Sequence, residues 1–387
     1  MSATPSAWTS LRLLPRSVWW LAGATLINRM GAMVFPFLVL YFHRHLGLAL
    51  ETATTIAACY GLGSGAAAPL GGWLADRFDA VRVLAYSMLA AGALMAAFPW
   101  IKGTVPLVTA TFVVALLTDL SRPSSLTALA RLGGSGQSRD AFNLNYLAVN
   151  LGMSVGPLLG GYLALYDYRL LFWGNACSSL TAGAMLLASG TRSPQESGSG
   201  ERADWNVGRS AFRAVFWTIV ALWVFMTFFA ATPVYVVEVL QRPESLVGWI
   251  WLLNTGLIVF TTVQINHFTK GKPLPKLLAC SALLFAFGYA LFLVLPGLAG
   301  PIACMLALTV GEMMLFTNSS AYLQRVVPAH KMGRAMALNS IAVSVALTAS
   351  TPAVGYFFSA HRPDLLWAMC ATAGLFAALG FWRLPKP

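Results

Sequence analysis

Four charged residues lie inside long apolar stretches of this chain. Asp119 and Arg122 interrupt one stretch, Glu312 interrupts another, and Arg29 stands within TLINRMGAMVFPF near the N-terminus. A charged side chain at membrane depth costs at least about 2.5–3.5 kcal/mol on insertion scales, so each is a functional candidate. An acidic group at that depth can take up and release a proton. A basic group there can bind an anionic ligand or neutralise an acid.

Asp119 and Glu312 are the candidates for proton coupling. Each falls about midway along its apolar stretch, and a shift of 194 residues places Asp119 on Met313, the neighbour of Glu312. The alternative for either acid is a structural hydrogen bond between helices. We expect at least one of the two to carry a proton.

The two arginines are candidates for substrate binding or for charge pairing. Arg122 follows Asp119 by three residues and so shares its helix face, where a local ion pair would leave Glu312 as the better proton carrier. Arg29 is expected either to bind an anionic substrate group or to pair with Asp119 or Glu312.

The remaining ionisable and metal-binding residue types have simpler interpretations. Glu238 ends an apolar stretch near the predicted outer surface. We interpret it either as a gate residue or as a solvated helix end, and we favour the second interpretation. His43 and His45 are two residues apart at another predicted helix end, and we expect no metal site there. The five cysteines are scattered without a CxxC pair and are interpreted as reduced packing residues.

The composition requires a membrane protein to position these groups. Of 387 residues, 58% are hydrophobic and 10% charged, whereas soluble domains carry about 25% charged residues. The mean hydropathy is +0.69. The first apolar stretch is too long for a cleavable signal and contains Arg29. The predicted fold class is therefore an all-α membrane protein.

A span needs about 20 apolar residues, and this criterion predicts twelve transmembrane helices in two six-helix bundles. A basic, glycine-rich loop is expected at 131–140, and short Gly/Pro turns at Lys102-Gly103 and Pro296-Gly297 separate two further pairs of helices. The predicted spans are 18–42, 52–75, 83–101, 105–130, 141–165, 169–190, 212–237, 246–268, 275–296, 299–324, 334–359 and 364–383.

The basic charge follows the loops. With both termini cytoplasmic, 18 of the 25 Lys and Arg residues fall on the cytoplasmic side, 5 outside and 2 within spans. This bias obeys the positive-inside rule. The net charge of +12 is thereby explained by topology, and we expect no nucleic-acid partner.

The chain divides into two halves that repeat. A polar stretch rich in Ser, Gly and charges predicts a cytoplasmic linker at 191–211 between a bundle at 1–190 and a bundle at 212–387. The shift of 194 residues matches Arg131 with Arg325, Asn145 with Asn339, and Gly161-Tyr162 with Gly355-Tyr356. Parallel repeats of this kind are found in transporters that bind substrate between their halves.

A glycine-rich span follows the Asp119 segment. Gly152, Gly156 and Gly160 are four residues apart, on one helix face that another helix can approach closely. Pro157 removes one helical hydrogen bond and is expected to bend this helix. Gly161 extends the motif.

The sequence resembles the major facilitator superfamily over essentially its whole length. Gly72, Asp76 and Arg77, followed by Arg82, are similar to the family's GxLaDrxGrr signature, with Asp79 in the place of a glycine and Ala80-Val81 in the place of basic residues. The resemblance implies that Asp76 clamps the inner side by contacting the start of the eleventh helix and nearby arginines.

Gly152-Met-Ser-Val-Gly156-Pro157-Leu-Leu-Gly160-Gly161 resembles the family's gxxxGPxxGG motif at every defined position. In the family this motif is characteristic of exporters that exchange substrate for protons. Arg122 is also similar to the family's helix-4 arginine, although Ser125 and Leu126 replace the usual Gln-Gly.

The resemblance implies twelve helices, alternating access, a central cavity and no metal or other cofactor. We therefore expect a monomeric secondary transporter of the bacterial inner membrane that exports small amphipathic or drug-like molecules in exchange for protons. Its partners would be a small-molecule substrate, protons and membrane lipid. The alternatives are a proton-coupled importer of peptides, metabolites or organic anions, a lipid or lysolipid translocator, and a non-transporting membrane sensor. No P-loop or hydrolase motif occurs, so no enzymatic activity is expected.

Overall fold

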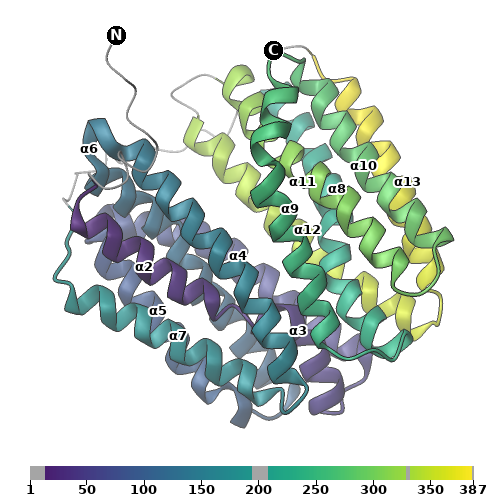
Figure 1. Cartoon of the computed structure of the whole chain (residues 1–387), viewed down its shortest axis with the longest axis horizontal. Helices are drawn as coiled ribbons and strands as arrows, with labels where there is room; N and C mark the ends of the chain where they lie inside the picture. Colours follow the sequence, from purple (N-terminus) through teal and green to yellow (C-terminus); the bar gives the residue numbers. More distant parts are fainter. Residues whose placement is uncertain (1–13, 194–207, 328–331, 386–387) are drawn as a thin grey trace. The chain divides into compact units, whose positions relative to one another are not determined.

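The computed structural model describes residues 14–193, 208–327 and 332–385, and within these ranges the regular structure is helical throughout (Figure 1). The chain forms two compact units. Unit 1 comprises Met1–Phe35 with Ala66–Glu201, and unit 2 comprises Pro36–Gly65 with Arg202–Pro387. Helix α4 (Leu50–Arg77) contributes to both units.

The remaining helices follow the apolar stretches closely. Unit 1 contains α2 (Arg16–Met30), α5 (Ala80–Ala97), η2 (Phe98–Trp100), α6 (Thr104–Ala164) and α7 (Arg169–Ala188). Helix α3 (Val34–Leu40) runs from unit 1 into unit 2. Unit 2 also contains η1 (Tyr41–His45), α8 (Arg209–Val234), η3 (Tyr235–Val239), α9 (Ser245–Thr269), α10 (Leu274–Val294), α11 (Ala299–Val326), α12 (Met332–Ser359) and α13 (Pro363–Trp382).

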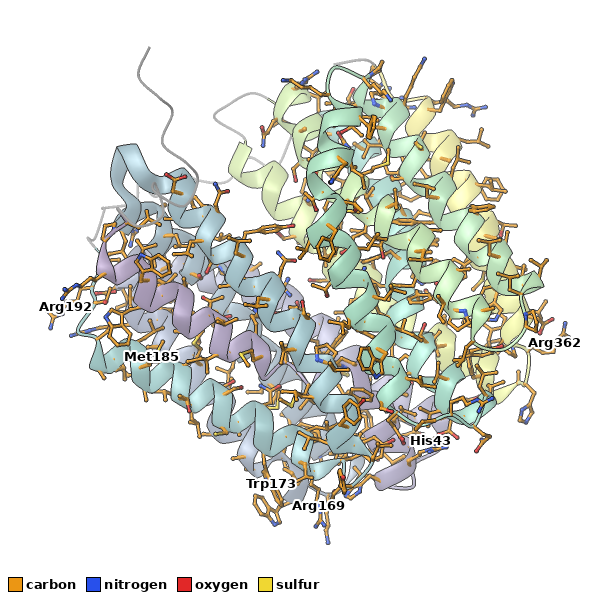
Figure 2. All side chains as sticks on the ribbon, in the orientation of Figure 1. His43, Arg169, Trp173, Met185, Arg192 and Arg362 are labelled. Carbon is orange, nitrogen blue, oxygen red and sulfur yellow. The ribbon has the colours of Figure 1, made fainter. Side chains whose placement is uncertain are left out.

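The predicted all-α membrane fold is confirmed. Eleven helical stretches of the described chain are long and apolar enough to cross a membrane, and α4, with 28 residues, occupies the remaining predicted span. The two short turns predicted at Lys102-Gly103 and Pro296-Gly297 do separate helices. Figure 2 shows Arg169 and Trp173 at one end of α7 and Arg192 beyond its other end.

The first span departs from the prediction because it is broken. Helix α2 ends at Met30, a turn occupies Gly31–Met33, and α3 begins at Val34. Pro36 explains the break, because a proline has no N–H to donate to the carbonyl four residues earlier. Proline is tolerated in the first turn of the new helix, where that N–H would have no helical partner.

The predicted loop at 131–140 is wrong as to its backbone. The helical assignment runs from Thr104 to Ala164 without interruption. The chain nevertheless reverses direction between two helical arms, 104–132 and 140–164. The reversal is evident because Ser125 of the first arm and Asn145 of the second line the same cavity. In a straight helix, 20 residues would separate these side chains by about 30 Å. This segment contains no proline, and its glycines weaken a helix without excluding it.

The 194-residue repeat has a structural counterpart in unit 2. One π-helical turn begins at Tyr41 and a second begins at Tyr235, which is the same spacing. Arg44 of the first turn joins the second: its Nε donates to Glu238 Oε1 at 2.6 Å and its Nη2 to the Val237 carbonyl at 3.1 Å. Arg44 Nη1 also lies 3.4 Å from Glu244 Oε1. His43, labelled in Figure 2, donates from Nδ1 to the Leu48 carbonyl at 2.7 Å.

Each unit has its own apolar core. In unit 1, α2 packs on α6 and α7, and α5 packs on α6 and α7. In unit 2, α10 packs on α11 and α13, and α8 packs on α12 and α13. Stacked and edge-on rings of Phe292, Trp367 and Tyr235 pack together near the ends of α10, α13 and α8, and the hydroxyl of Tyr289 donates to the Val224 carbonyl at 2.8 Å.

Candidate functional site

A polar cavity of about 350 Å³ lies inside unit 1. Helices α2, α5 and both arms of α6 enclose it, and its volume is in the range of small-ligand sites. Two of the predicted site residues, Arg29 and Arg122, line this cavity. Its remaining lining residues are Thr25, Asn28, Leu84, Met88, Ser121, Ser125, Leu126, Asn145, Val149 and Met153.

Three polar atoms of the cavity wall are buried without a hydrogen-bond partner among the described residues: Thr25 Oγ1, Ser125 Oγ and Asn145 Oδ1. All three side chains are at least nine-tenths buried. A buried polar atom without a partner costs roughly 1–3 kcal/mol, and such atoms are rare in folded proteins. All three residues line the same cavity, which makes it a candidate site for a polar ligand or water.

Asp119 and Arg122 form the local ion pair that their spacing predicts. Arg122 Nε lies 3.2 Å from Asp119 Oδ1. The Asp119 side chain is only 7% exposed, whereas that of Arg122 is 60% exposed. The carboxylate is thus the buried partner, and the arginine extends from it into the cavity.

Arg29 occupies the last turn of α2, directly before the break, and the glycine motif packs against it. A Cβ built on Gly152 would lie 2.5 Å from the Cβ of Arg29, and one on Gly156 would lie 3.0 Å from the Arg29 carbonyl oxygen. Only glycine allows α6 to approach α2 this closely. Pro157, Gly160 and Gly161 are likewise buried in the second arm of α6. The motif therefore sets the position of a cavity-lining arginine.

The signature around α4 and α5 has a different local basis. Asp79, which departs from the family pattern, caps α5 by accepting from the Val81 and Arg82 amides at 2.9 and 3.3 Å. An aspartate at this position satisfies helix-end donors that a glycine cannot. The Asp79 Oδ1 atom also accepts from the Ser193 hydroxyl at 3.2 Å.

Basic groups secure the end of α4. Arg131 Nη1 donates to the Ala75 carbonyl at 3.0 Å, and the Arg77 guanidinium lies 5.7 Å from the Trp73 ring centre. The side chain of Asp76 lies outside the described residues, so its clamping role stays a prediction.

The close packing of α4 belongs to a residue that the signature does not include. A Cβ on Gly71 would lie 2.5 Å from Pro123 Cγ, whereas one on Gly72 would meet nothing within 4 Å. In unit 1 it is thus Gly71 that allows α4 to approach the first arm of α6.

Glu312 lies in unit 2 in an environment unlike that of Asp119. Its Oε2 accepts a hydrogen bond from Asn254 Nδ2 at 3.0 Å, and the same amide donates to Thr309 Oγ1 at 2.9 Å. Among the described residues Glu312 has no ion-pair partner within 4.0 Å. The two acids are near-equivalent in the repeat, but only Asp119 has a cation beside it.

Two aromatic side chains lie one helical turn from the Glu312–Asn254 pair. Trp251 precedes Asn254 by one helical turn on α9, and Phe316 follows Glu312 by one turn on α11. Phe229 and Phe225 connect them: the Phe229 and Trp251 rings are centred 4.5 Å apart, and the Phe225 and Phe316 rings 6.2 Å apart. These four rings form one aromatic cluster that links α8, α9 and α11 near the Glu312–Asn254 pair.

Glu238 is placed at the end of its helical stretch, and whether it acts as a gate or only as a terminus stays a prediction. Its carboxylate is 24% exposed and is bound by Arg44. Sequence spacing could not reveal this contact, because the partners are 194 residues apart.

The cavity and the carboxyl site depend on residues that the sequence analysis did not single out. Thr25, Asn145 and Asn254 are uncharged, and polar residues of these types occur throughout the spans. The only signal was the match of Asn145 with Asn339 in the repeat.

Comparison with known proteins identifies the family. The model of the Major Facilitator Superfamily matches residues 21–351. The MFS-type transporter YttB of Bacillus subtilis is 22% identical over 330 residues, which cover 83% of both chains. A Na(+), Li(+), K(+)/H(+) antiporter of Planococcus maritimus is 25% identical over 368 residues, with 84% of this chain and 85% of that one covered.

Among solved structures, a peptide transporter POT in complex with sulfate superposes with a TM-score of 0.80 over 99% of this chain and all of that one, at 16% identity. At that identity the likeness concerns the fold alone. The family model and the curated relatives both cover far more than half of this chain. The protein belongs to the major facilitator superfamily.

Proposed function

We propose that this protein is a proton-coupled antiporter that exports small amphipathic molecules by alternating access. The observation that carries the proposal is the contrast between the two intramembrane acids. Asp119 faces the guanidinium of Arg122 at 3.2 Å, whereas Glu312 is bound by the neutral amide of Asn254. Glu312 is therefore our candidate for the proton carrier.

The physical reason is the cost of burying charge. A buried carboxylate without a counter-ion bears a desolvation penalty that protonation removes. Protonation of Asp119 would instead remove the negative charge that Arg122 Nε faces. The Asn254 amide can donate to an ionised Glu312, and its carbonyl can accept from a protonated one, so the site accommodates both forms. A change in solvent access to Glu312 would then couple proton movement to conformational change.

The substrate class is inferred from the lining. The aromatic group formed by Phe225, Phe229, Trp251 and Phe316 includes residues one helical turn from Glu312 and from Asn254, and an aromatic setting near an acid suits an amphipathic cation. The outward direction is supported by the gxxxGPxxGG motif, whose glycines pack on α2 at Arg29.

The test is transport by the full chain in efflux-deficient bacterial cells. Cells expressing the wild type should accumulate less of a fluorescent cationic dye than cells without the protein, and a protonophore should abolish the difference. Glu312→Gln should abolish it as well, with unchanged protein level in the membrane. The matched control is Glu51→Gln, an exposed acid in the first turn of α4, which should export normally.

Two results would reject this proposal. Export that survives in Glu312→Gln with its pH dependence intact would exclude Glu312 as the carrier. Higher dye accumulation in wild-type cells would reverse the direction and favour the importer.

A second candidate is exchange of alkali cations for protons. The Na(+), Li(+), K(+)/H(+) antiporter of Planococcus maritimus motivates it, and Glu312 Oε2 and Thr309 Oγ1 are brought together by the Asn254 amide nitrogen that both contact. Hard monovalent and divalent cations bind such oxygen ligands. Proteoliposomes with an internal pH indicator separate the candidates: proton release on addition of Na⁺, Li⁺ or K⁺, without any response to the dye, would favour cation exchange.

A further inference from the structure

A groove in unit 2 is unrelated to the polar cavity and to Glu312. It has a volume of about 700 Å³ and lies between α8 and α13, which pack side by side. The arginines Arg209, Arg213 and Arg383 stand at its end, and Phe216, Trp217 and Phe376 form walls along its length. We call these six residues the arginine groove. It opens at the end of unit 2 where the C-terminus is marked in Figure 1, which the positive-inside rule predicts to be cytoplasmic.

The three arginines concentrate positive charge at one point. Arg209 and Arg213 are four residues apart, so their side chains share a face of α8, where like charges disfavour the helix. Arg213 Nη2 donates to the Arg383 carbonyl at 3.3 Å, which brings the end of α13 to the same place. All three side chains are exposed. Arg and Lys are the residues that bind phosphate oxygens, and Arg does so with two parallel hydrogen bonds.

Acidic residues of unit 2 do not offset this charge. Of those that the structure describes, Glu238 and Glu244 are held by Arg44 at the other end of the unit, and Asp364 begins α13 at that same far end. Glu312 lies in the middle of α11 and does not line the groove. Glu51, in the first turn of α4, does not line the groove either, so no acidic residue among those that the structure describes stands in the arginine groove.

The apolar walls extend away from the charge in one direction. Phe216 lies seven residues beyond Arg209 on α8, and Phe376 lies seven residues before Arg383 on α13. At 1.5 Å per residue, each phenylalanine is about 10 Å deeper along its helix than the arginine. The two rings are 56% and 63% exposed. The apolar walls therefore begin about 4.5 Å beyond Arg213 and about 10 Å beyond Arg209 and Arg383, all in the same direction along the groove.

A glycine creates the depth of the groove. The Trp217 ring rests directly on Gly380 of α13, so closely that a Cβ at this position would overlap the ring. Gly380 itself is buried. Because of this contact, Trp217 lies between α8 and α13 at the bottom of the groove, whereas Phe216 and Phe376 are exposed on its two sides.

We propose that the arginine groove is a binding site for one anionic phospholipid, with the phosphate on Arg209, Arg213 and Arg383 and an acyl chain along Phe216, Trp217 and Phe376. Basic pockets between transmembrane helices on the cytoplasmic side bind such head groups. A free phosphate would leave the exposed rings without a contact. A second copy of this chain would bring together two like-charged clusters, which repel each other.

The test is native mass spectrometry of the full-length protein, purified in detergent and stripped of lipid. The protein is titrated with phosphatidylglycerol and, separately, with phosphatidylcholine. We expect one phosphatidylglycerol to bind in preference to phosphatidylcholine. The triple variant Arg209→Gln/Arg213→Gln/Arg383→Gln should weaken this event roughly a hundredfold, since each basic residue near an anionic membrane contributes about fivefold.

Two controls separate the site from general basicity and from free phosphate. Arg16→Gln/Arg192→Gln/Lys270→Gln removes the same charge from exposed positions on the predicted cytoplasmic side and should leave the binding unchanged. Phe216→Ala/Phe376→Ala should weaken binding of the lipid. Millimolar inorganic phosphate should not displace it.

Equal binding of phosphatidylglycerol by the arginine variant and the wild type would overturn the proposal. An equal loss in the control triple would reduce it to general electrostatics, and displacement by inorganic phosphate would assign the groove to a soluble anion. The phenylalanine variant keeps all three charges, so a normal affinity in that protein would also refute an acyl-chain site.

Discussion

Replacing Gly152 with alanine tests whether the glycine motif positions Arg29. The added methyl carbon would lie 2.5 Å from the Cβ of Arg29 and 3.0 Å from its carbonyl carbon. Ordinary carbon contacts are about 3.5–4.0 Å, so α2 and the second arm of α6 must separate by roughly 1 Å. Overpacking of this size costs about 1–3 kcal/mol. With an unfolding entropy of about 2.1 cal/mol/K per residue, the melting temperature of the whole chain should fall by roughly 1–4 °C.

The functional loss should exceed the loss of stability. Arg29 lines the polar cavity, and a displacement of about 1 Å in a positioned group can cost roughly a hundredfold in activity. We therefore expect the initial rate of dye efflux to fall at least about tenfold, at equal protein level in the membrane. Thermal unfolding in detergent, followed by tryptophan fluorescence, measures stability on the same preparation.

Gly72→Ala is the matched control for this substitution. A Cβ on Gly72 meets nothing within 4 Å, and alanine is favoured over glycine inside a helix by about 1 kcal/mol. The control should therefore unfold at the same or a slightly higher temperature. An unchanged melting temperature and efflux rate in Gly152→Ala would refute the reasoning, as would equal damage in Gly72→Ala.

Three further predictions concern polar contacts and use thermal unfolding of the purified full chain. Asp79→Ala removes the cap of α5 and the hydrogen bond to Ser193, so it should lower the free energy of unfolding by about 1 kcal/mol. Asp79→Asn should retain most of the stability, and equal values for the two variants would contradict capping. A double-mutant cycle of Arg44→Gln and Glu238→Gln should give a coupling of about 0.5–1 kcal/mol that weakens in high salt, and strictly additive effects would exclude this ion pair as a contributor. Arg122→Gln removes the charge beside the buried Asp119 carboxylate and should lower the free energy of unfolding by about 1–3 kcal/mol. Adding Asp119→Asn should restore the stability, and a fully stable single variant would show that Asp119 does not depend on Arg122.

Most of the fold was predictable from the sequence because the bilayer imposes one dominant rule. Each span must be helical and apolar for about 20 residues, and that rule located twelve spans. It failed where local backbone chemistry decides: the break at Gly31–Met33 and the helical connection at 131–140. Hydropathy carries no information about either feature, since both depend on which backbone groups find hydrogen-bond partners.

The candidate site was predictable only where the contact is local. Asp119 and Arg122 are three residues apart on one helix, so their ion pair follows from helical geometry. The spacing of the motif glycines predicts close helix packing, but it does not identify Arg29 as the residue that they contact. Asn254 was invisible as the partner of Glu312, because 58 residues and a helix-to-helix contact separate them.

The sequence by itself determined that this is a membrane protein. It also determined the helical spans, the internal repeat and the charges that lie within the spans. These properties depend on composition and on periodicity along one helix. The tertiary structure alone decided that Glu312 has the Asn254 amide for a partner, that Arg44 binds Glu238, and that Arg383 joins Arg209 and Arg213 in one groove. The physical reason is that a side chain's electrostatic environment is set by neighbours from other helices, and the register between helices is set by packing rather than by hydropathy.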